Sequence, residues 1–384
     1  GLGIGRDPTS GTNPEENGNP VWVTPIGNGD TAVTVYVDYD ADPTTGSLTD
    51  PNDNKYDVSY SLKELERRKV YDPNDDDQTG MLLYVLTPGI KLVGAWGQDP
   101  LTASAAAPGL DLGTGIPPLP LFDAGKTATL YEDRDNDGYV SPGDVLLYTI
   151  VINNIARAPV PDMLLKDAFP VDAIYVEDST NLTKSATGIT TAIPDSGVTA
   201  FPLDEGGVIL DNVNALPVGG SYTVTFQAII KDFVDLTPGM TEIVNTGNAT
   251  AVGTTIDFET RTPIYGRLGD YVWLDQDLNG TQNAGEPGVA NVTVNLLDDN
   301  GNPVLDVFNN PVTTVTNATG FYQFIGLLPG NYSVEFIKPA GYDFTLQDQG
   351  QDDTLDSDAD TVTGRTSVIM LAAGESNQTI DAGI

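Results

Sequence analysis

The stretch Val145–Ile152 reads VLLYTIVI, and Tyr222–Ile230 further along the chain reads YTVTFQAII. Both are short runs of β-branched and aromatic residues, the composition that favours a pleated, half-buried strand. Three further runs have the same character: Thr31–Val37, Val289–Leu297 and Asn331–Ile337. Turn clusters rich in Gly, Pro and Asn separate them. This alternation predicts an all-β protein built from sandwiches.

The composition favours the same fold class. The 384-residue chain has 41 Gly and 27 Pro, and its 55 acidic residues comprise 43 Asp and only 12 Glu. Asp hydrogen-bonds its own nearby backbone and therefore favours caps, turns and cation loops over helix interiors. Only Ser61–Lys69 (SLKELERRK) has helical character, and we expect a solvated local helix of about two turns there; the alternative is a basic docking patch.

Charge and residue types exclude several classes of function. The chain contains neither His nor Cys, which removes disulfides and the usual zinc, haem, Cys–His and Ser–His–Asp sites. A net charge of −38 repels nucleic acid and anionic membrane. No apolar run approaches the ~20 residues of a membrane span, and the start at Gly1 lacks Met and a signal-peptide pattern. We expect the mature or excised portion of an extracellular, surface or secreted protein that inserts into no membrane.

Two changes in composition divide the chain. Pro100–Phe122 is rich in Pro, Ala and Gly, which suits an extended connection, and a shorter boundary lies near Thr260–Arg267. The three resulting segments are 1–122, 123–264 and 265–384. The first is β-rich and of unknown type. Each has the size of one sandwich, and the short second boundary predicts stiff end-to-end packing. We expect tandem immunoglobulin-like or prealbumin-like β-sandwiches arranged as a rod, with little helix.

The loop Asp275–Glu286 (DQDLNGTQNAGE) matches D-x-[DN]-x-[DN]-G-x₅-E at every specified position. In a calcium loop of this spacing, side-chain oxygens come from Asp275, Asp277 and Asn279. Thr281 offers its carbonyl, and Glu286 closes the sphere with two oxygens. Strand-like residues flank the loop, which excludes a helical calcium sensor and favours a static structural site. The alternative is an acidic solvated turn.

A second loop, Asp133–Asp144 (DRDNDGYVSPGD), repeats the spacing. Its expected ligands are the side chains of Asp133, Asp135, Asp137 and Asp144, the carbonyl of Tyr139 and, less regularly, Ser141. Because Asp is shorter than Glu, we expect Asp144 to bind through one oxygen or a water. Four carboxylates within twelve residues would repel one another in an empty loop, so a bare turn is costly.

Less regular acidic clusters lie elsewhere, and each alone could be a solvated turn. Asp348–Asp360 (DQGQDDTLDSDAD) provides five candidate calcium ligands: Asp352, Asp353, Asp356, Asp358 and Asp360. In the first segment the candidates are Asp38, Asp40 and Asp42, with further carboxylates in Asp50–Asp53 and Asp72–Asp77. We expect several calcium ions in all.

Four stretches of the last 120 positions share a pattern: GDYVWLDQDLNGTQNAGEPGVANVTVNLLDDNG, TNATGFYQFIGLLPGNYSVEF, DDTLDSDADTVTGRT and the terminal DAGI. They resemble the calcium-binding B repeats of bacterial serine-aspartate-repeat surface proteins, which are related to the collagen-adhesin B-type fold. The resemblance implies a calcium-stiffened β-sandwich that serves as a stalk. It also implies one site at Asp275, Asp277, Asn279 and Glu286 and others in Asp352–Asp360.

The middle segment contains PGDVLLYTIVINN, LKDAFP, LPVGGSYTVTFQAII and IVNTGNATA. These stretches resemble a bacterial envelope repeat called "domain of unknown function eleven". Related pilin domains can join a Lys on the first strand to an Asn on the last with the help of a buried acid. That likeness implies Lys126, Asp167 and Asn245 or Asn248 as a possible isopeptide group; the alternative is a surface Lys and a turn Asn. The first strand expected in segment 265–384 (YGRLGDYVW) contains Arg267 and no Lys, so we expect no such bond there.

The leading functional hypothesis is an extracellular structural protein, a calcium-stabilised rod in a bacterial surface fibre, filament or stalk. Its partners would be copies of itself or other surface proteins, joined through β-strand edges, with Gly1–Gly5 as one strand that could insert. The alternative is an adhesin or carbohydrate-binding module with an unidentified extracellular ligand. Its aromatic candidates are Trp22, Trp96 and Trp273, although their strand-like surroundings are typical of a core. We expect no enzyme, because the acids fall in ion-loop spacing rather than as a glycosidase pair.

Overall fold

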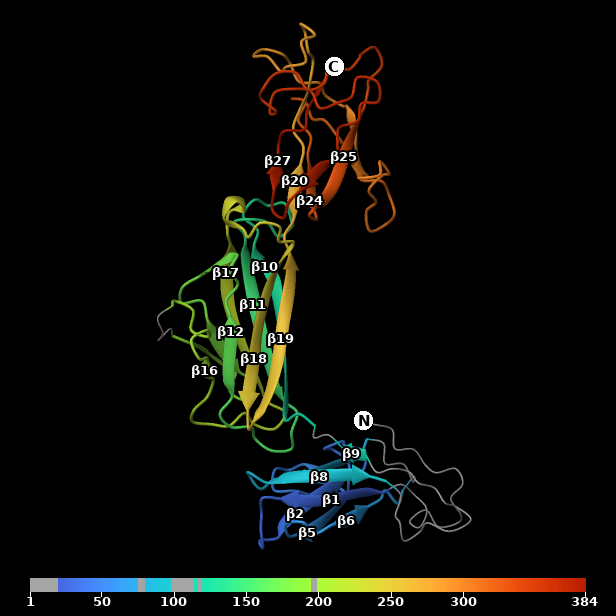
Figure 1. Ribbon diagram of the computed structural model, residues 1–384. Helices are drawn as coiled ribbons and strands as arrows, with labels where there is room; N and C mark the ends of the chain where they lie inside the picture. The colour runs from blue at the N-terminus through green and yellow to red at the C-terminus, as the bar shows by residue number, and fades with distance from the viewer. Residues whose placement is uncertain (1–19, 75–79, 98–113, 117–118, 195–198) are drawn as a thin grey trace, which may run out of the picture.

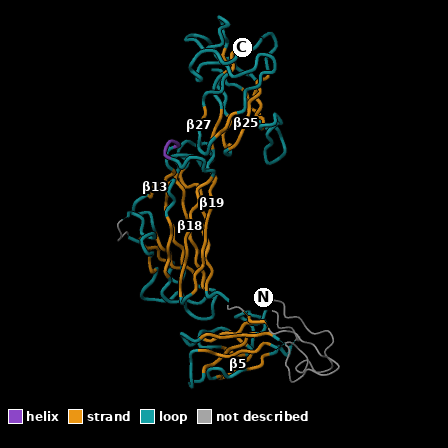
Figure 2. The backbone as a smooth tube through the Cα atoms, in the orientation of Figure 1, coloured by secondary structure: helices purple, strands orange, loops and turns teal. Residues whose placement is uncertain are grey.

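The computed structural model describes residues 20–74, 80–97, 114–116, 119–194 and 199–384. Within these ranges the regular structure is β-strand apart from one 3₁₀ turn, η1 (Phe233–Asp235), as Figure 2 shows. The all-β prediction is therefore confirmed. No helix in these ranges has the length and apolar character needed to cross a membrane. The predicted insertion of Gly1–Gly5 and most of the predicted connection Pro100–Phe122 lie outside the described residues.

The N-terminal sandwich consists of two small sheets and a short hairpin. One sheet has the order β6-β1-β8-β9: β1 (Val21–Ile26), β6 (Arg68–Val70), β8 (Lys91–Trp96) and β9 (Thr114–Ile116). The other has the order β5-β2-β7: β2 (Val33–Asp38), β5 (Val58–Leu62) and β7 (Leu82–Val85). The hairpin pairs β3 (Leu48–Thr49) with β4 (Lys55–Tyr56). Alternating apolar side chains of β1, β2, β5 and β6 meet in one small core.

The helix predicted over Ser61–Lys69 is wrong. The range contains the end of β5, a turn and the start of β6. Leu62 pairs with Val33 on β2 and buries its side chain in the core, so tertiary pairing overrides the helix-favouring charged residues of the turn.

The middle sandwich has the longest strands and the largest core. Its first sheet has the order β10-β11-β17-β14-β15, with β13 also paired to β17: β10 (Phe122–Glu132), β11 (Val145–Asn154), β13 (Ala173–Tyr175), β14 (Asn181–Lys184), β15 (Ile189–Ala192) and β17 (Ser221–Ile230). Its second sheet has the order β16-β12-β18-β19: β12 (Leu164–Ala168), β16 (Val208–Ile209), β18 (Glu242–Ala251) and β19 (Thr254–Pro263). Buried and partly exposed residues alternate along β11 and β17, which directs one face of each strand inward.

The C-terminal sandwich uses shorter strands and longer loops. A four-stranded sheet has the order β23-β22-β25-β26: β22 (Thr293–Asp298), β23 (Thr313–Val315), β25 (Gly330–Ile337) and β26 (Ile369–Leu371). A second sheet has the order β24-β20-β27: β20 (Gly266–Leu268), β24 (Phe324–Leu327) and β27 (Ser376–Asn377). A further pair joins β21 (Val272–Trp273) to β28 (Ala382–Gly383).

The three sandwiches follow one another along an elongated molecule (Figure 1). The C-terminal sandwich continues from the end of the middle one, whereas the strands of the N-terminal sandwich run across those of the middle one. Ile264 and Ala373 both enter the core of the middle sandwich, so the second junction is apolar and continuous. The C-terminal and middle sandwiches thus lie end to end, as predicted, whereas the first junction has a different angle; the stiffness of the second junction stays a prediction.

Candidate functional site

The loop Asp275–Glu286 is folded around its own carboxylates. Asp275, Asp277 and Glu286 each place one oxygen within 4.8 Å of the others. The buried Asp275 accepts backbone hydrogen bonds from Leu278 at 2.7 Å and Gly280 at 2.8 Å. Glu286 closes the loop by accepting the N–H groups of residues 276 and 283 at 2.7 and 2.8 Å. The arrangement offers a cation three carboxylate ligands in one small volume.

Gly280 and Asn279 stabilise the backbone conformation of this loop. Gly280 has φ +80°, and a Cβ there would lie 2.4 Å from the carbonyl oxygen of Leu346. Asn279 accepts the N–H of Thr281 at 2.7 Å through Oδ1. Burial opposes ionisation of Asp275, but bonds from the Thr345 hydroxyl and three backbone amides hold the pKa of Asp275 below its usual value. Asp275 therefore stays ionised and able to bind a cation.

The loop Asp133–Asp144 repeats most of this hydrogen-bond pattern. Asp133 accepts the N–H of Gly138 at 2.8 Å, as Asp275 does from Gly280. Asp133, Asp135 and Asp137 form a second group with oxygens within 4.8 Å. Asp144 is outside that group: its two oxygens accept the N–H groups of residues 134 and 141 at 2.9 and 2.8 Å. Glu286 accepts the two corresponding N–H groups, so the closing residues differ only in that the shorter Asp144 lies outside the group of close oxygens.

A third acidic group lies beside the first loop. Asp353, Asp356 and Asp358 bring their oxygens within 4.8 Å, and the backbone N–H of Gln282 donates to the carbonyl of Leu355 at 2.6 Å. Asp356 is only 8% exposed, and its Oδ1 has no hydrogen-bond partner in the described structure. A buried carboxylate oxygen without a partner is costly unless something else binds it. This observation points to a ligand in the group.

Two residues predicted for the same cluster lie outside it. Asp352 accepts the Thr354 hydroxyl at 2.7 Å, and Asp360 accepts the Thr363 hydroxyl at 2.7 Å. Each carboxylate stabilises its own local turn, the ordinary role of Asp in turns. Asp352 and Asp360 therefore lie outside the close group, and their role as calcium ligands stays a prediction.

Asp381, which the sequence pattern did not single out, is the most strongly perturbed acid near this group. It is only 1% exposed, its backbone N–H donates to Asp358 at 2.6 Å, and its Oδ2 has no partner in the described structure. Burial, with nearby Asp270 and Asp358, raises the pKa of Asp381 to about 9. Burial raises the pKa of Asp358 to about 7, with repulsion from neighbouring aspartates adding to it. The only sequence signal of Asp381 was its place in the terminal DAGI.

Of the acids predicted for a site in residues 1–122, Asp38 and Asp40 lie close enough to interact, but no third carboxylate joins them among the described residues. Asp38 is fully buried and forms an ion pair with Arg157 of the middle sandwich, Nη2 to Oδ2 at 2.7 Å. Asp40 and Asp42 are exposed and accept the hydroxyls of Thr45 and Thr44. In the described part of this segment no three carboxylates meet the 4.8 Å condition. Asp38 therefore forms an interdomain contact, whereas Asp40 and Asp42 stabilise a turn.

The Asp133–Asp144 loop also forms the junction with the C-terminal sandwich. Arg267 forms an ion pair with Asp135 at 2.8 Å, and the N–H of Tyr265 donates to the carbonyl of Val140 at 2.8 Å. A Cβ at Gly326 would lie 2.2 Å from the ring of Tyr139, so this ring packs directly on a glycine. The same loop thus carries a candidate ion site and an interdomain contact.

A second candidate site lies inside the middle sandwich. Lys126 on β10 bonds to Asp167 on β12, and both side chains are completely buried. Asn245 on β18 is fully buried beside Asp167 and Tyr148, but neither of its side-chain polar atoms has a hydrogen bond of good geometry. Burial lowers the pKa of Lys126 to about 8 and raises the pKa of Asp167 to about 6. These directions favour a neutral amine and a protonated acid.

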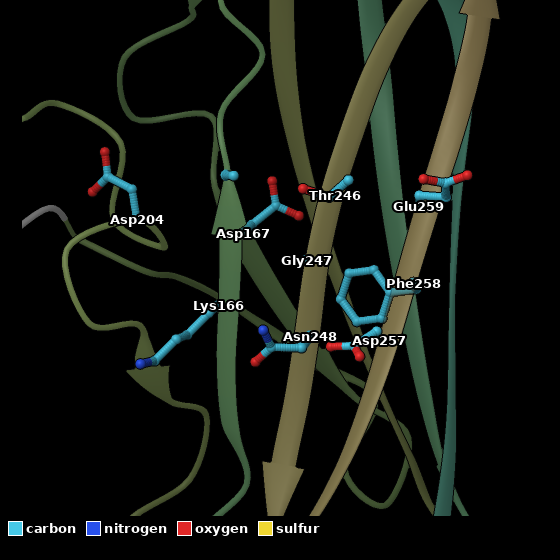
Figure 3. Close-up of a pocket in the computed structure, with 10 residues that line it drawn as sticks. Lys166, Asp167, Asp204, Thr246, Gly247, Asn248, Asp257, Phe258 and Glu259 are labelled. Carbon is cyan, nitrogen blue, oxygen red and sulfur yellow. The ribbon is translucent and has the colours of Figure 1, made fainter.

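The structure separates Asn245 from the other candidate, Asn248. Along β18 the buried residues alternate with exposed ones, and Asn248 lies on the outer face opposite Lys166 (Figure 3). There it lines an open hollow of ≈ 590 Å³ that also reaches Asp167 and Phe258. Of the two asparagines, only Asn245 therefore belongs to the buried group.

The tryptophans differ in exposure. Trp273 is fully buried in the C-terminal sandwich, and Trp22 and Trp96 are half-buried on neighbouring strands β1 and β8. The core interpretation thus holds for Trp273. A shared aromatic surface of all three is excluded.

These features define a chain of tandem β-sandwiches with loops in which carboxylates gather. Residues 266–384 match the SdrD B-like domain and are a domain of that type. Serine-aspartate repeat-containing protein F of Staphylococcus epidermidis is 45% identical over 129 residues, 34% of this chain and 7% of that protein. Serine-aspartate repeat-containing protein D of Staphylococcus aureus strain Newman is 35% identical over 194 residues, 48% of this chain and 13% of that protein. The chain therefore spans a small part of these relatives.

Solved structures that align with this chain include two major pilins. BcpA, the major pilin subunit of Bacillus cereus, aligns with a TM-score of 0.30 and 12% identity over 95% of this chain and 98% of that one. SpaA of Corynebacterium diphtheriae aligns with a TM-score of 0.28 and 11% identity over 95% of both chains. Superposition at this level supports no functional inference. The resemblance of residues 123–264 to the domain of unknown function eleven stays a prediction.

Proposed function

We propose that this chain is an extracellular structural segment, a calcium-stiffened rod of β-sandwiches in a bacterial surface fibre, filament or stalk. The observation that carries the proposal is the gathering of carboxylates at three places, each within 4.8 Å, two of them in loops with the same hydrogen bonds. The role is structural rather than catalytic, because these acids lie in turns that leave no opposed pair across a cleft.

Calcium would act by linkage. An ion that binds the folded loops and not the unfolded chain stabilises the fold by about 2.7 kcal/mol at a hundredfold excess over Kd. Extracellular sites with Kd of about 10⁻⁴–10⁻³ M still fill, because calcium outside cells is abundant. The Asp133–Asp144 loop would also hold the second junction, since Asp135 and Tyr139 contact the C-terminal sandwich. The candidate ligands are those of the three groups, with Asn279 and the Thr281 and Tyr139 carbonyls completing the two loops.

Chelation tests this proposal. The melting temperature and the resistance to protease should both fall when EDTA removes calcium, and added calcium should restore them. Magnesium serves as the control, because it demands a tighter octahedral shell than these flexible oxygen loops provide. Identical melting curves in calcium and EDTA would refute calcium stiffening.

We further propose an isopeptide bond between Lys126 and Asn245. The neutral Nζ of Lys126 attacks Cγ of Asn245, Asp167 shuttles the proton, and one ammonia leaves. The bond would join β10 of one sheet to β18 of the other, and so resist separation of the sheets under tension. Intact mass spectrometry provides the test: a polypeptide lighter than its sequence by one ammonia supports the bond, and the full sequence mass refutes it.

A further inference from the structure

The middle sandwich contains a buried tyrosine whose hydroxyl group serves no visible purpose in the fold. Tyr148 lies on β11, near the centre of the first sheet, and its side chain is fully buried. Its hydroxyl forms no hydrogen bond of good geometry with any described residue. A buried hydroxyl without a partner destabilises the folded state, whereas the ring of a phenylalanine would avoid that cost. The hydroxyl of Tyr148 therefore needs an explanation other than packing.

The neighbouring strand shows what a phenylalanine does in the same surroundings. Phe226 on β17 lies directly across from Tyr148 in the strand register, and the two rings stack with their centroids 5.0 Å apart. The Nζ atom of Lys126 lies 5.0 Å from the centre of the Tyr148 ring and 5.2 Å from that of Phe226. Both rings therefore cover the amine of Lys126, and Phe226 does so without a polar atom. Covering this amine does not require the hydroxyl of Tyr148.

The hydroxyl of Tyr148 lies beside the side-chain amide of Asn245, which belongs to the opposite sheet. Asn245 is fully buried on β18, where it is close enough to interact with both Tyr148 and Asp167. Neither polar atom of Asn245 forms a hydrogen bond of good geometry, so a half-turn of the amide can bring its Oδ1 to the hydroxyl. A donor and an acceptor that both lack partners are thus neighbours in an apolar core.

We propose that Tyr148 is a catalytic residue of isopeptide formation, whose hydroxyl donates a hydrogen bond to Oδ1 of Asn245 while the bond to Lys126 forms. The inference rests on the proposed Lys126–Asn245 bond and adds a residue to it. When Nζ of Lys126 attacks Cγ of Asn245, the electron pair of the C=O bond moves to Oδ1, which becomes negatively charged. A hydrogen bond from a buried donor stabilises this oxyanion more than it stabilises the neutral amide, and so lowers the barrier.

Asp167 and Tyr148 have separate tasks in this reaction. Protonated Asp167 gives its proton to Nδ2 of Asn245 and receives the proton that Nζ of Lys126 loses. The bond between Cγ and Nδ2 then breaks, ammonia leaves, and the electron pair on Oδ1 forms the C=O bond of the new amide. Tyr148 keeps its proton throughout: burial and the nearby Asp167 hold the pKa of its hydroxyl well above the usual value, so it acts as a neutral donor.

The rate of bond formation in the variant Tyr148→Phe tests this inference. The whole chain is synthesised in a cell-free reaction, samples are quenched in acid at intervals, and intact mass spectrometry gives the fraction that is lighter by one ammonia. Loss of an oxyanion donor should slow bond formation about 10²–10³-fold. The matched control Tyr222→Phe removes the hydroxyl of another buried tyrosine, which pairs with Ile152 elsewhere in the same sheet. This control should react as fast as the unaltered chain.

A second pair of variants separates catalysis from folding. Lys126→Met removes the amine and with it any bond, so the variants K126M and K126M/Y148F differ only in the hydroxyl of Tyr148. Their melting temperatures should agree, or the double variant should melt slightly higher, because it buries no oxygen without a partner. A double variant that melts lower than K126M would show that the hydroxyl serves the fold, and this result overturns the proposal.

The masses distinguish the role of Tyr148 from the bond on which it depends. If the unaltered chain keeps its full sequence mass, the bond is refuted and the role of Tyr148 with it. If the unaltered chain loses one ammonia and Tyr148→Phe loses it equally fast, the bond stands and only the role of Tyr148 is refuted. Slow loss in Tyr148→Phe, with normal loss in Tyr222→Phe, supports the hydroxyl as the oxyanion donor.

Discussion

Asp277→Asn provides a selective test of calcium at the Asp275–Glu286 loop. The Asp277 carboxylate receives only long bonds from the Asn283 amide, at 3.3 and 3.5 Å, whereas Glu286 holds two backbone amides. Replacing Asp277 therefore removes a ligand charge with little damage to the ion-free loop. It also relieves repulsion among three carboxylates within 4.8 Å. The variant should lose stability in calcium only.

The magnitude follows from linkage. At a hundredfold excess over Kd, calcium contributes about 2.7 kcal/mol, and a tenfold weaker site retains about 1.4 kcal/mol. For a unit of about 120 residues, 1 kcal/mol moves Tm by about 4 °C. Asp277→Asn should therefore lower the calcium-bound Tm of the C-terminal sandwich by about 5 °C and leave the Tm in EDTA unchanged or slightly higher.

Differential scanning calorimetry of the whole chain in calcium and in EDTA provides the assay. Asp343→Asn is the matched control, because its carboxylate is 94% exposed and pairs only with Lys338 among the described residues. It should melt as the unaltered chain does under both conditions. Equal Tm losses for Asp277→Asn with and without calcium would show that the residue serves the fold alone, and the ion-site reasoning would fail.

Three further predictions concern the middle sandwich and its two junctions. The variant Asn245→Ala cannot form the bond, so its measured mass should equal the mass calculated from its own sequence, with no ammonia lost. By analogy with other crosslinks that close loops of about 120 residues, losing the bond should cost about 5 kcal/mol of stability. The outward neighbour Asn248→Ala should keep the bond, and equal mass losses in both variants would contradict the assignment. Gly326→Ala should bend or loosen the second junction, because the φ of Gly326 is +69° and the Tyr139 ring leaves no room for a methyl group. Small-angle scattering should then show a shorter maximum dimension. The control Gly330→Ala, where an added Cβ has no contact closer than 3.5 Å, should leave this dimension unchanged. Burial and Asp40 raise the pKa of Asp38 to about 7, although Arg157 acts to lower it. Protonated Asp38 therefore contributes to the free energy of unfolding. This contribution is complete below 3.8, the pKa of Asp38 in the unfolded chain, and is lost as pH rises through 7. The N-terminal sandwich should thus melt lower at a pH of about 8 than at a pH of about 5, and Asp38→Asn should flatten this dependence.

Local patterns predicted the strands and the two regular loops well. Period-two apolar residues in β11 and β17, and a fixed ligand spacing in two loops, are encoded within about ten residues and survive folding unchanged. Ser61–Lys69 misled because its charges favour a helix, while burial of Leu62 beside Val33 depends on a strand remote in sequence. The irregular Asp348–Asp360 run had no spacing that distinguishes ligands from turn residues.

The sequence alone thus determined an all-β, strongly acidic chain with two regularly spaced acidic loops, because strand alternation and loop spacing are short-range properties. The tertiary structure decided which distant groups meet. It paired Asp38 with Arg157, added Asp381 to the neighbourhood of Asp358, and set Asn245 rather than Asn248 beside Lys126 and Asp167. These contacts join strands from different sheets or different sandwiches. Their distances depend on how whole layers pack, which no local pattern of residues specifies.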